Sequence, residues 1–239
     1  MRSWLLFVLA AAGAAPAHAD LTATYVAVNP EMDFTMKVEV AANGDLRADS
    51  DMPGVYLVKH GGSTYFVFPD QGGPAVIDLE DAVTLLEEEL SRIDPDFCEG
   101  AAQAGSALTL RPRGTVTVGG RIGEAYATAG RPASRPDVVI SRDPSLAPIG
   151  AAMAAQYRVS MTLMRQCPSA VPMFTQMQEL LDSGAPLQIG PMRLDRIDTA
   201  AIDPARFLLP AAPATREEAR ALMTRNRLSP VGIEVQPPH

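Results

Sequence analysis

Short runs of alternating apolar and polar residues dominate the first third of the chain. In Phe34–Val40 every second residue is apolar, which is the pattern of a strand with one buried and one wet face. Val55–Lys59 and Thr64–Phe68 are apolar on both faces, so we expect these strands to be covered on each side. Turn-forming pairs separate the runs at Asn43-Gly44, Pro53-Gly54, Gly61-Gly62 and Gly72-Gly73. Residues 34–79 are therefore predicted to form four or five antiparallel strands connected as a meander.

The apolar spacing changes from two to three or four residues at the end of this segment. The apolar positions that share the new spacing are Leu79, Ala82, Val83, Leu86, Leu90 and Ile93. They predict an amphipathic helix that begins near Asp78 and ends before Asp94-Pro95. Acidic residues fall on the other side of this helix, which we expect to face solvent: Glu80, Glu87, Glu88 and Glu89.

Strand patterns also flank the meander and its helix. Leu21–Val28 is expected to add one strand before the meander. After the helix, strands are predicted at Ala107–Arg111, Thr115–Val118, Ile122–Thr128 and Asp137–Ser141.

The last third of the chain returns to helical spacing. Two apolar stripes, over residues 149–164 and 173–181, predict a pair of helices, and Leu187–Thr199 is expected to be a strand. Thr215 and Glu218 have the spacing of a capping box at the start of a last helix. We therefore predict an α+β fold, with one domain over residues 20–228 and a flexible tail over residues 229–239.

The N-terminus has the order of a secretory signal peptide. A lone Arg2 precedes the apolar stretch Trp4–Ala12, and small residues then lead to Ala17-His18-Ala19. We predict a signal peptide over residues 1–19, cleavage after Ala19, and export to the periplasm. The residue directly after the predicted cleavage site is Asp20 and not a cysteine, so we expect no lipid anchor there. No later segment has the length of a membrane-spanning helix, so we expect no integral membrane span.

Composition and charge exclude one class of partner. The net charge is −8, whereas nucleic-acid binding relies on basic residues that neutralise phosphates, so we expect no nucleic-acid partner. The two cysteines, Cys98 and Cys167, are expected to meet an oxidising environment after export. A disulfide between them would close a loop of about 70 residues and stabilise the fold by roughly 4 kcal/mol. Two separate buried thiols are the alternative.

Residues suited to catalysis are few. His60 is expected at a solvated hairpin tip, and no spacing of His, Cys and carboxylates predicts a metal site. The chain contains no G-x-S-x-G motif, and Asp49, Asp51, Asp78 and Asp81 have the neighbours of turn and cap residues. We therefore predict a non-enzymatic protein without metal or cofactor; a hydrolase with an unrecognised site is the least favoured alternative.

Methionine is unusually frequent on the predicted helical pair. Because its side chain is unbranched and polarisable, methionine-rich walls adapt to irregular apolar ligands, although the same residues can simply fill a core. Both interpretations stay open. In the ligand-binding interpretation the apolar lining would comprise Met36, Tyr56, Phe66, Met153, Tyr157, Met161, Met164, Met173, Met177 and Met192.

Part of the chain resembles a known superfamily. The stretch GDLRADSDMPGVYLVKHGGSTYFVFPDQGGPAVIDLEDA and the later GAPLQIGPMRLDRIDTAAIDPARFLLP are similar to patterns of the lipoprotein-carrier-like (LolA/LppX-like) superfamily, especially a branch of unknown function. The order of the predicted elements resembles that superfamily too. The chain departs from the pattern at His60-Gly61, where a hairpin Asp-Gly is usual, and it lacks the acylated cysteine of anchored members.

The resemblance implies a curved antiparallel half-barrel wrapped around helices, with an apolar cavity between them. It also implies a lipid or lipoprotein acyl chain as a possible partner, and it gives Arg47 the position of a strand arginine that holds a lid. We therefore predict an exported periplasmic protein that holds a lipid or other apolar ligand. The alternative is a structural or interaction protein of the cell envelope with a filled core. The oligomeric state is left open.

Overall fold

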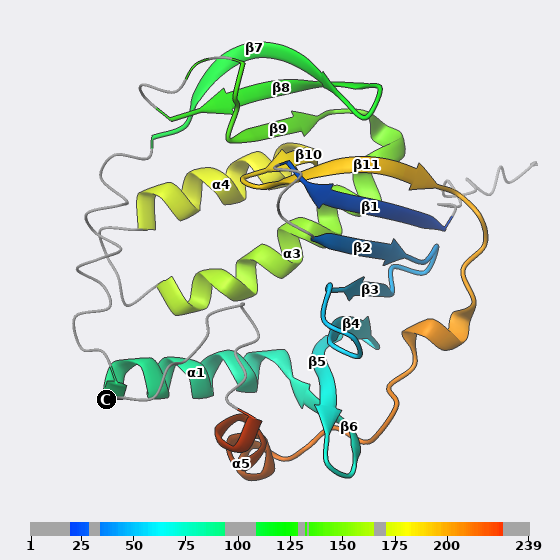
Figure 1. Ribbon diagram of the computed structural model, residues 1–239, viewed down its shortest axis with the longest axis vertical. Helices are drawn as coiled ribbons and strands as arrows, with labels where there is room; N and C mark the ends of the chain where they lie inside the picture. Colours follow the sequence, from blue (N-terminus) through cyan, green and yellow to red (C-terminus); the bar gives the residue numbers. More distant parts are fainter. Residues whose placement is uncertain are drawn as a thin grey trace, which may run out of the picture.

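In the part of the chain that the structure describes, an open, wholly antiparallel sheet of 11 strands is accompanied by four α-helices (Figure 1). The computed structural model describes residues 20–28, 34–93, 109–128, 132, 134–164 and 171–226, without the side chains at 90–93 and 159–164. The predicted α+β class is confirmed. The predicted signal peptide (1–19), the tail (229–239), Cys98 and Cys167 lie outside the described residues.

The predicted meander is present as the five strands β2–β6, and strand β1 precedes it. These six strands are β1 (Leu21–Ala27), β2 (Thr35–Val40), β3 (Leu46–Asp49), β4 (Tyr56–His60), β5 (Ser63–Asp70) and β6 (Gly73–Asp78). Each strand pairs with the next one along the chain, so β6 is one edge of the sheet. The tight turns at Gly61-Gly62 and Gly73 need the positive φ angles that glycine adopts without strain.

The other half of the sheet comes from the C-terminal half of the chain. Its strands are β7 (Arg111–Val118), β8 (Arg121–Ala127), β9 (Val138–Ser141), β10 (Ala185–Ile189) and β11 (Met192–Asp198). The two halves join where β11 pairs with β1, and the strand order is β6-β5-β4-β3-β2-β1-β11-β10-β9-β8-β7.

Two strand predictions in this half were wrong. Leu187–Thr199 is not one strand but the hairpin β10–β11, because Gly190, at φ 51°, and Pro191 form a turn. Residues 109–110 of the predicted strand Ala107–Arg111 lie outside any strand, and residues 107–108 lie outside the described part of the chain. Arg111 instead begins β7, which continues through Val118 with an irregular register between Pro112 and Thr115. A bulge of this kind lets one strand continue past a Pro and a Gly.

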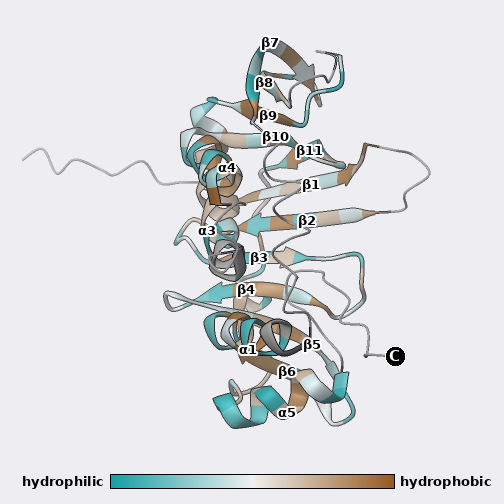
Figure 2. Ribbon diagram, turned by 90° about the vertical axis from the view of Figure 1, so that its left-hand side faces the viewer, coloured by the Kyte–Doolittle hydropathy of each residue, from teal (hydrophilic) through white to brown (hydrophobic). Residues whose placement is uncertain are grey.

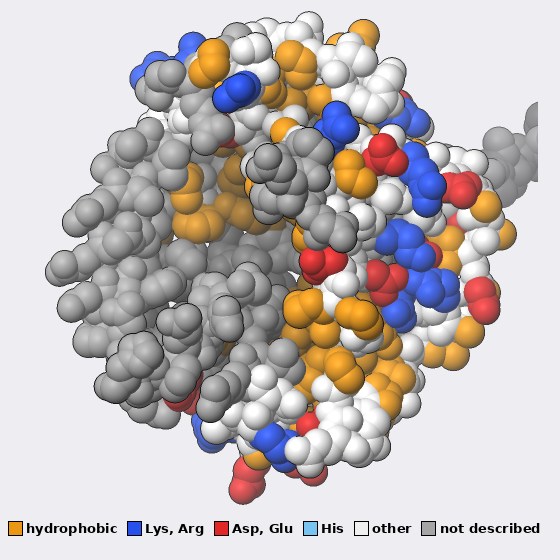
Figure 3. Space-filling view, in the orientation of Figure 1, with side chains coloured by type: hydrophobic (Ala, Val, Ile, Leu, Met, Phe, Trp, Pro, Cys, Tyr) orange, Lys and Arg blue, Asp and Glu red, His pale blue; other side chains and the backbone are white. Residues whose placement is uncertain are grey.

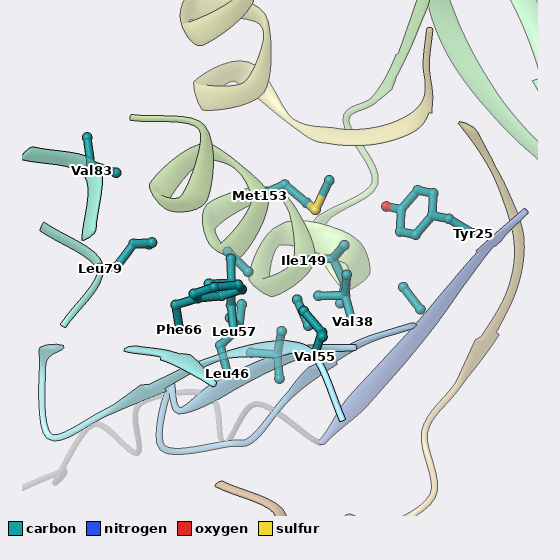
Figure 4. Close-up of a cluster of buried hydrophobic side chains, with 14 of the residues drawn as sticks. Tyr25, Val38, Leu46, Val55, Leu57, Phe66, Leu79, Val83, Ile149 and Met153 are labelled. Atoms are coloured by element: carbon teal, nitrogen blue, oxygen red, sulfur yellow. The ribbon is translucent and has the colours of Figure 1, made fainter. Parts of the chain in front are cut away.

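Of the described helices, three lie on one side of the sheet, which we call the helix face (Figure 2). They are α1 (Leu79–Ile93), α3 (Ala147–Met164) and α4 (Val171–Ser183). The predicted start of α1 is confirmed, because the Asp78 carboxylate accepts a hydrogen bond from Glu80 N. Apolar side chains of β2–β5 point toward α3 and α1 and form the main core with Ile149 and Met153 (Figure 4).

The C-terminal strap, residues 199–215, leaves β11 and passes along the opposite side of the sheet, the outer face (Figure 1). It contains the short 3₁₀ helix η2 (Pro204–Phe207) and leads to α5 (Arg216–Asn226). Ala214 N donates to Val76 O at 2.8 Å, which satisfies a backbone group on edge strand β6. The strap therefore covers an edge that would otherwise be open to pairing with another chain.

Helix α5 packs against α1 through charges as well as apolar contacts. The predicted capping box is confirmed: Thr215 N donates to Glu218 Oε2 at 2.8 Å, and Glu218 N donates to Thr215 Oγ1 at 3.4 Å. Glu88 of α1 pairs with Arg216 and Arg220 at 2.8 and 2.7 Å. The acidic side of α1 was predicted to face solvent, but at Glu88 it faces α5.

Tyr25 bridges a divergence in the sheet. Strands β10 and β11 pair at only two positions, and the register of β10 shifts near Pro186, which has no N–H to offer. The Tyr25 side chain reaches from β1 to β10, and its hydroxyl donates to Pro186 O at 2.9 Å. Burial raises the pKa of this hydroxyl, so it stays protonated and keeps donating.

Asp20 ties the start of β1 to two distant segments, which makes its contribution pH-dependent. Its carboxylate accepts hydrogen bonds from Ile202 N at 2.8 Å and Ala42 N at 2.9 Å, and both lower the pKa of Asp20. We expect Asp20→Asn to lower the free energy of unfolding at pH 7 by about 1 kcal/mol, because an amide group cannot accept both bonds as a carboxylate does.

The lowered pKa determines the direction of the pH dependence of this effect. The contribution of Asp20 is present above the ordinary aspartate pKa of 3.8 and is lost as the pH falls through the folded-state value. Urea unfolding of both chains at a series of pH values checks the prediction. The difference should be constant near neutral pH and shrink below about pH 4. A difference that persists unchanged into strong acid would contradict this role for Asp20.

Candidate ligand-binding groove and outer-face ion cluster

An open groove lies between the helix face of the sheet and the first half of α3. Its volume is about 350 Å3, within the range of roughly 300–1,000 Å3 that is typical of small-molecule sites. The sheet contributes Leu46 and Leu57, which point toward α3 (Figure 4). The complete lining is Val40, Ala41, Ala42, Gly44, Leu46, Leu57, Lys59, Thr64, Ala147, Pro148, Ala151, Ala152, Ala155 and Gln156.

Small side chains on α3 create the groove. Ala147, Ala151, Ala152 and Ala155 line it, and an alanine leaves unfilled the volume that a leucine would occupy between helix and sheet. Gly150 brings α3 against the chain at Gly184, because a Cβ on Gly150 would lie only 2.9 Å from the carbonyl carbon and oxygen of Gly184. The helix is therefore held close to β10 on one side and stands off the sheet on the other.

The groove contains none of the predicted lining residues whose side chains the structure describes. Phe66 and Met153 are buried in the main core, and Met36 packs against it, so these three fill space as core residues do. Tyr157 and Met177 pack against a second cluster around Ile140 and Leu181. Met173 and Met192 are half-buried, on α4 and β11, and the side chains of Met161 and Met164 lie outside the described residues. The sequence feature that does mark the groove is the alanine-rich segment 151–155 of α3.

Tyr56 and Arg47 lie on the outer face. The prediction that Tyr56 lines the space between sheet and helices is wrong, because side chains alternate along β4: Leu57 faces the helices, while Tyr56 packs with Val58, Val67 and Val76. The Arg47 guanidinium stacks over the Tyr56 ring at 3.4 Å from its centroid. Arg47 also donates to the backbone oxygen of Arg206 at 3.2 Å. Arg47 therefore contacts the strap, and the lid-holding role that the resemblance implies for it stays a prediction.

The outer-face ion cluster comprises five side chains from β2, β3 and the strap: Lys37, Glu39, Arg47, Asp49 and Arg206. Arg206 donates to Glu39 at 2.6 Å and to Asp49 at 2.7 Å, while Lys37 lies 2.9 Å from Glu39. Burial opposes the charge on Arg206, but Glu39 and Asp49 outweigh it and raise the pKa of Arg206. Acidic and basic side chains intermingle over this part of the sheet (Figure 3). Both carboxylates in the cluster have cationic partners. The cluster therefore joins the strap to the sheet and leaves no unpaired carboxylate to bind a ligand.

Other potential sites offer less. A second hollow of about 540 Å3 lies between β6 and α5, and three charged residues line it. Asp70 and Arg225 are already paired at 2.8 Å, and Glu218 accepts the capping hydrogen bond from Thr215. His60 pairs with Asp45 at 3.3 Å at a hairpin end. Within the described residues, no group of three or more His, Cys, Asp or Glu side chains is placed to hold a metal ion. No helix in the described part of the chain is long and apolar enough to cross a membrane.

The groove and the ion cluster thus have different chemistry. The groove has an apolar wall with a few hydrogen-bond donors, which suits an apolar ligand with a polar end. The ion cluster is internally paired and fastens the strap to the sheet. Comparisons with protein-family models, curated proteins and solved structures found no match for this chain.

Proposed function

We propose that this chain is an exported, non-enzymatic binding protein that holds a lipid or other apolar ligand in the groove between sheet and α3. The observation that carries the proposal is an apolar groove of about 350 Å3 beside the main core, between the sheet and α3. The signal-like residues 1–19 support export. The helices on one face of a long antiparallel sheet support a half-barrel of the lipoprotein-carrier type.

The lining supports an extended apolar ligand. Ten of the lining residues are Ala, Val, Leu or Pro, and they come from the helix and from two hairpins of the sheet. Each methylene group buried in such a groove contributes about 0.8 kcal/mol, which corresponds to roughly a fourfold gain in affinity. The affinity of straight-chain alcohols should therefore rise with chain length until the groove is full.

The Ala151→Phe variant tests the proposal. Ala151 is exposed on α3 and lines the groove, so a phenylalanine there should occupy the space without disturbing the core. The full chain is expressed, and the exported form is purified and identified by mass as starting at Asp20. Displacement of N-phenyl-1-naphthylamine by alcohols of six to twelve carbons measures binding. We expect the variant to bind decanol at least about 10-fold more weakly, the equivalent of losing two buried methylenes.

A matched control is available on the neighbouring helix. Thr175 is exposed on α4 and is not part of the groove, so Thr175→Phe adds the same ring elsewhere and should leave the affinity unchanged. Melting temperatures of the three proteins show whether the fold is retained. Absence of alcohol binding in the native chain, or equal affinities in the native chain and the Ala151→Phe variant, would reject the groove as a ligand site. A purified protein that retains residues 1–19 would reject export by cleavage after Ala19.

A further inference from the structure

Among the described residues that line the groove, Lys59 is the only charged one. It lies on β4 directly opposite Thr64 of β5, so the two side chains stand next to each other on the helix face. Gln156 of α3 lines the same groove. An ammonium, a hydroxyl and a side-chain amide thus supply hydrogen-bond donors, and no acidic residue is among the described residues of the lining.

The environment of Lys59 differs from that of the chain's other lysine. Lys37 lies 2.9 Å from Glu39 in the outer-face ion cluster. Lys59 is half-buried, and within the described residues no acidic side chain lies at ion-pairing distance from its ammonium. In a chain of net charge −8, an unpaired cation beside an apolar groove creates a local preference for an anion.

We propose that the groove takes a single-chain anionic amphiphile, with its carboxylate or phosphate group at Lys59 and Thr64 and its hydrocarbon chain along the alanines of α3. This inference rests on the proposed function, since it names the class of ligand for the same groove. Lys59 is then a specificity-determining residue: its charge selects the head group, and the apolar wall supplies most of the affinity.

Three ligands with the same ten-carbon chain separate these contributions: decanoate, decanol and decyltrimethylammonium. Titration calorimetry on the exported form should show decanoate binding at least about 10-fold more tightly than decyltrimethylammonium. Lys59→Met keeps an apolar stem of similar length and removes the charge, so it should weaken decanoate binding by about 10-fold, the loss of one hydrogen bond to a charged group. Decanol binding should change less than about twofold, because the chain contacts are kept.

Lys37→Met is the matched control, because it removes the other lysine charge on the outer face and should leave all three affinities unchanged. A second readout does not depend on affinity differences. Limited acetylation followed by peptide mass spectrometry reports on both lysines separately, since the chain has only these two. Saturating decanoate should protect Lys59 and leave Lys37 reactive, whereas decanol should protect neither ammonium.

The results separate the proposed anion preference from the proposed binding of apolar ligands in the groove. Equal affinities for decanoate and decyltrimethylammonium, or a Lys59→Met variant that binds decanoate as the native chain does, would overturn the anion preference while groove binding of decanol still stood. Absence of binding for all three ligands would overturn both proposals.

Discussion

Gly184→Ala is expected to lower the free energy of unfolding by about 3 kcal/mol, at the upper end of what overpacking usually costs. Gly184 follows α4 and begins the return to the sheet at β10. A Cβ there would collide with the backbone oxygen of Ser141 and lie 2.9 Å from Cγ2 of Ile140. Both belong to β9, which pairs with β10, so neither atom can retreat without breaking the sheet register. Urea unfolding of the native chain and the variant measures the change.

Gly72→Ala is the control for Gly184→Ala. Gly72 lies in the β5–β6 turn, has no positive φ, and has no atom within 4 Å of the position that a Cβ would take. Alanine there should leave stability unchanged or raise it by less than about 1 kcal/mol, through the reduced entropy of the unfolded chain. Equal effects at the two positions would show that Gly184 acts through backbone flexibility and not through close packing.

The effect of Gly184→Ala should extend to the groove. The backbone at Gly184 touches α3 at Gly150, and α3 forms the helical wall of the groove. A displaced Gly184 therefore moves α3, and decanol affinity should fall even in conditions where the variant is folded. This coupling could not be predicted from the sequence, where Gly184 only marks the end of a helix.

The elements that local patterns specify were predicted well. Helix α1 and the capping box of α5 depend on residues within one or two turns, and the meander depends on successive hairpins. The pairing of β1 with β11 joins residues about 170 positions apart and has no local signature. The turn at Gly190-Pro191 does have a local signature, the Gly-Pro pair. The alternating strand pattern on both sides of this pair nevertheless favoured a single strand.

The candidate site was predicted less well, for a physical reason. Large flexible side chains suggested a lining, but large side chains fill volume, and Phe66 and Met153 are buried in the core. Empty space forms instead where side chains are small, as at Ala151 and Ala155, and alanine is too common in helices to stand out. Tyr56 shows the second difficulty, because in a strand covered on both sides the sequence alone does not say which face is which.

Arg206→Met is expected to lower the free energy of unfolding by about 2 kcal/mol, which is less than a fully buried pair would lose because the Arg206 side chain is 34% exposed. Arg206 brings the strap to β2 and β3, and Glu39, whose side chain is only 6% exposed, would keep Lys37 as its cationic partner after the substitution. A buried carboxylate that loses one of its hydrogen-bond donors keeps its desolvation penalty and therefore destabilises the folded state. The double variant Glu39→Gln, Arg206→Met should therefore be more stable than the sum of the single changes predicts, and urea unfolding of all four chains measures this coupling.

Arg216→Met provides the comparison that separates burial from charge. Arg216 also donates to a carboxylate at 2.8 Å, but that partner, Glu88, is 40% exposed and keeps Arg220 at 2.7 Å. The loss of Arg216 should therefore lower the free energy of unfolding much less than the loss of Arg206 does. If the strap is fastened by the outer-face ion cluster, Arg206→Met should also increase proteolytic cleavage within residues 199–215, whereas Arg216→Met should not. Equal stability losses in the two variants, without selective cleavage of the strap, would mean that apolar contacts such as those of Leu209 hold the strap and that the ion cluster adds little.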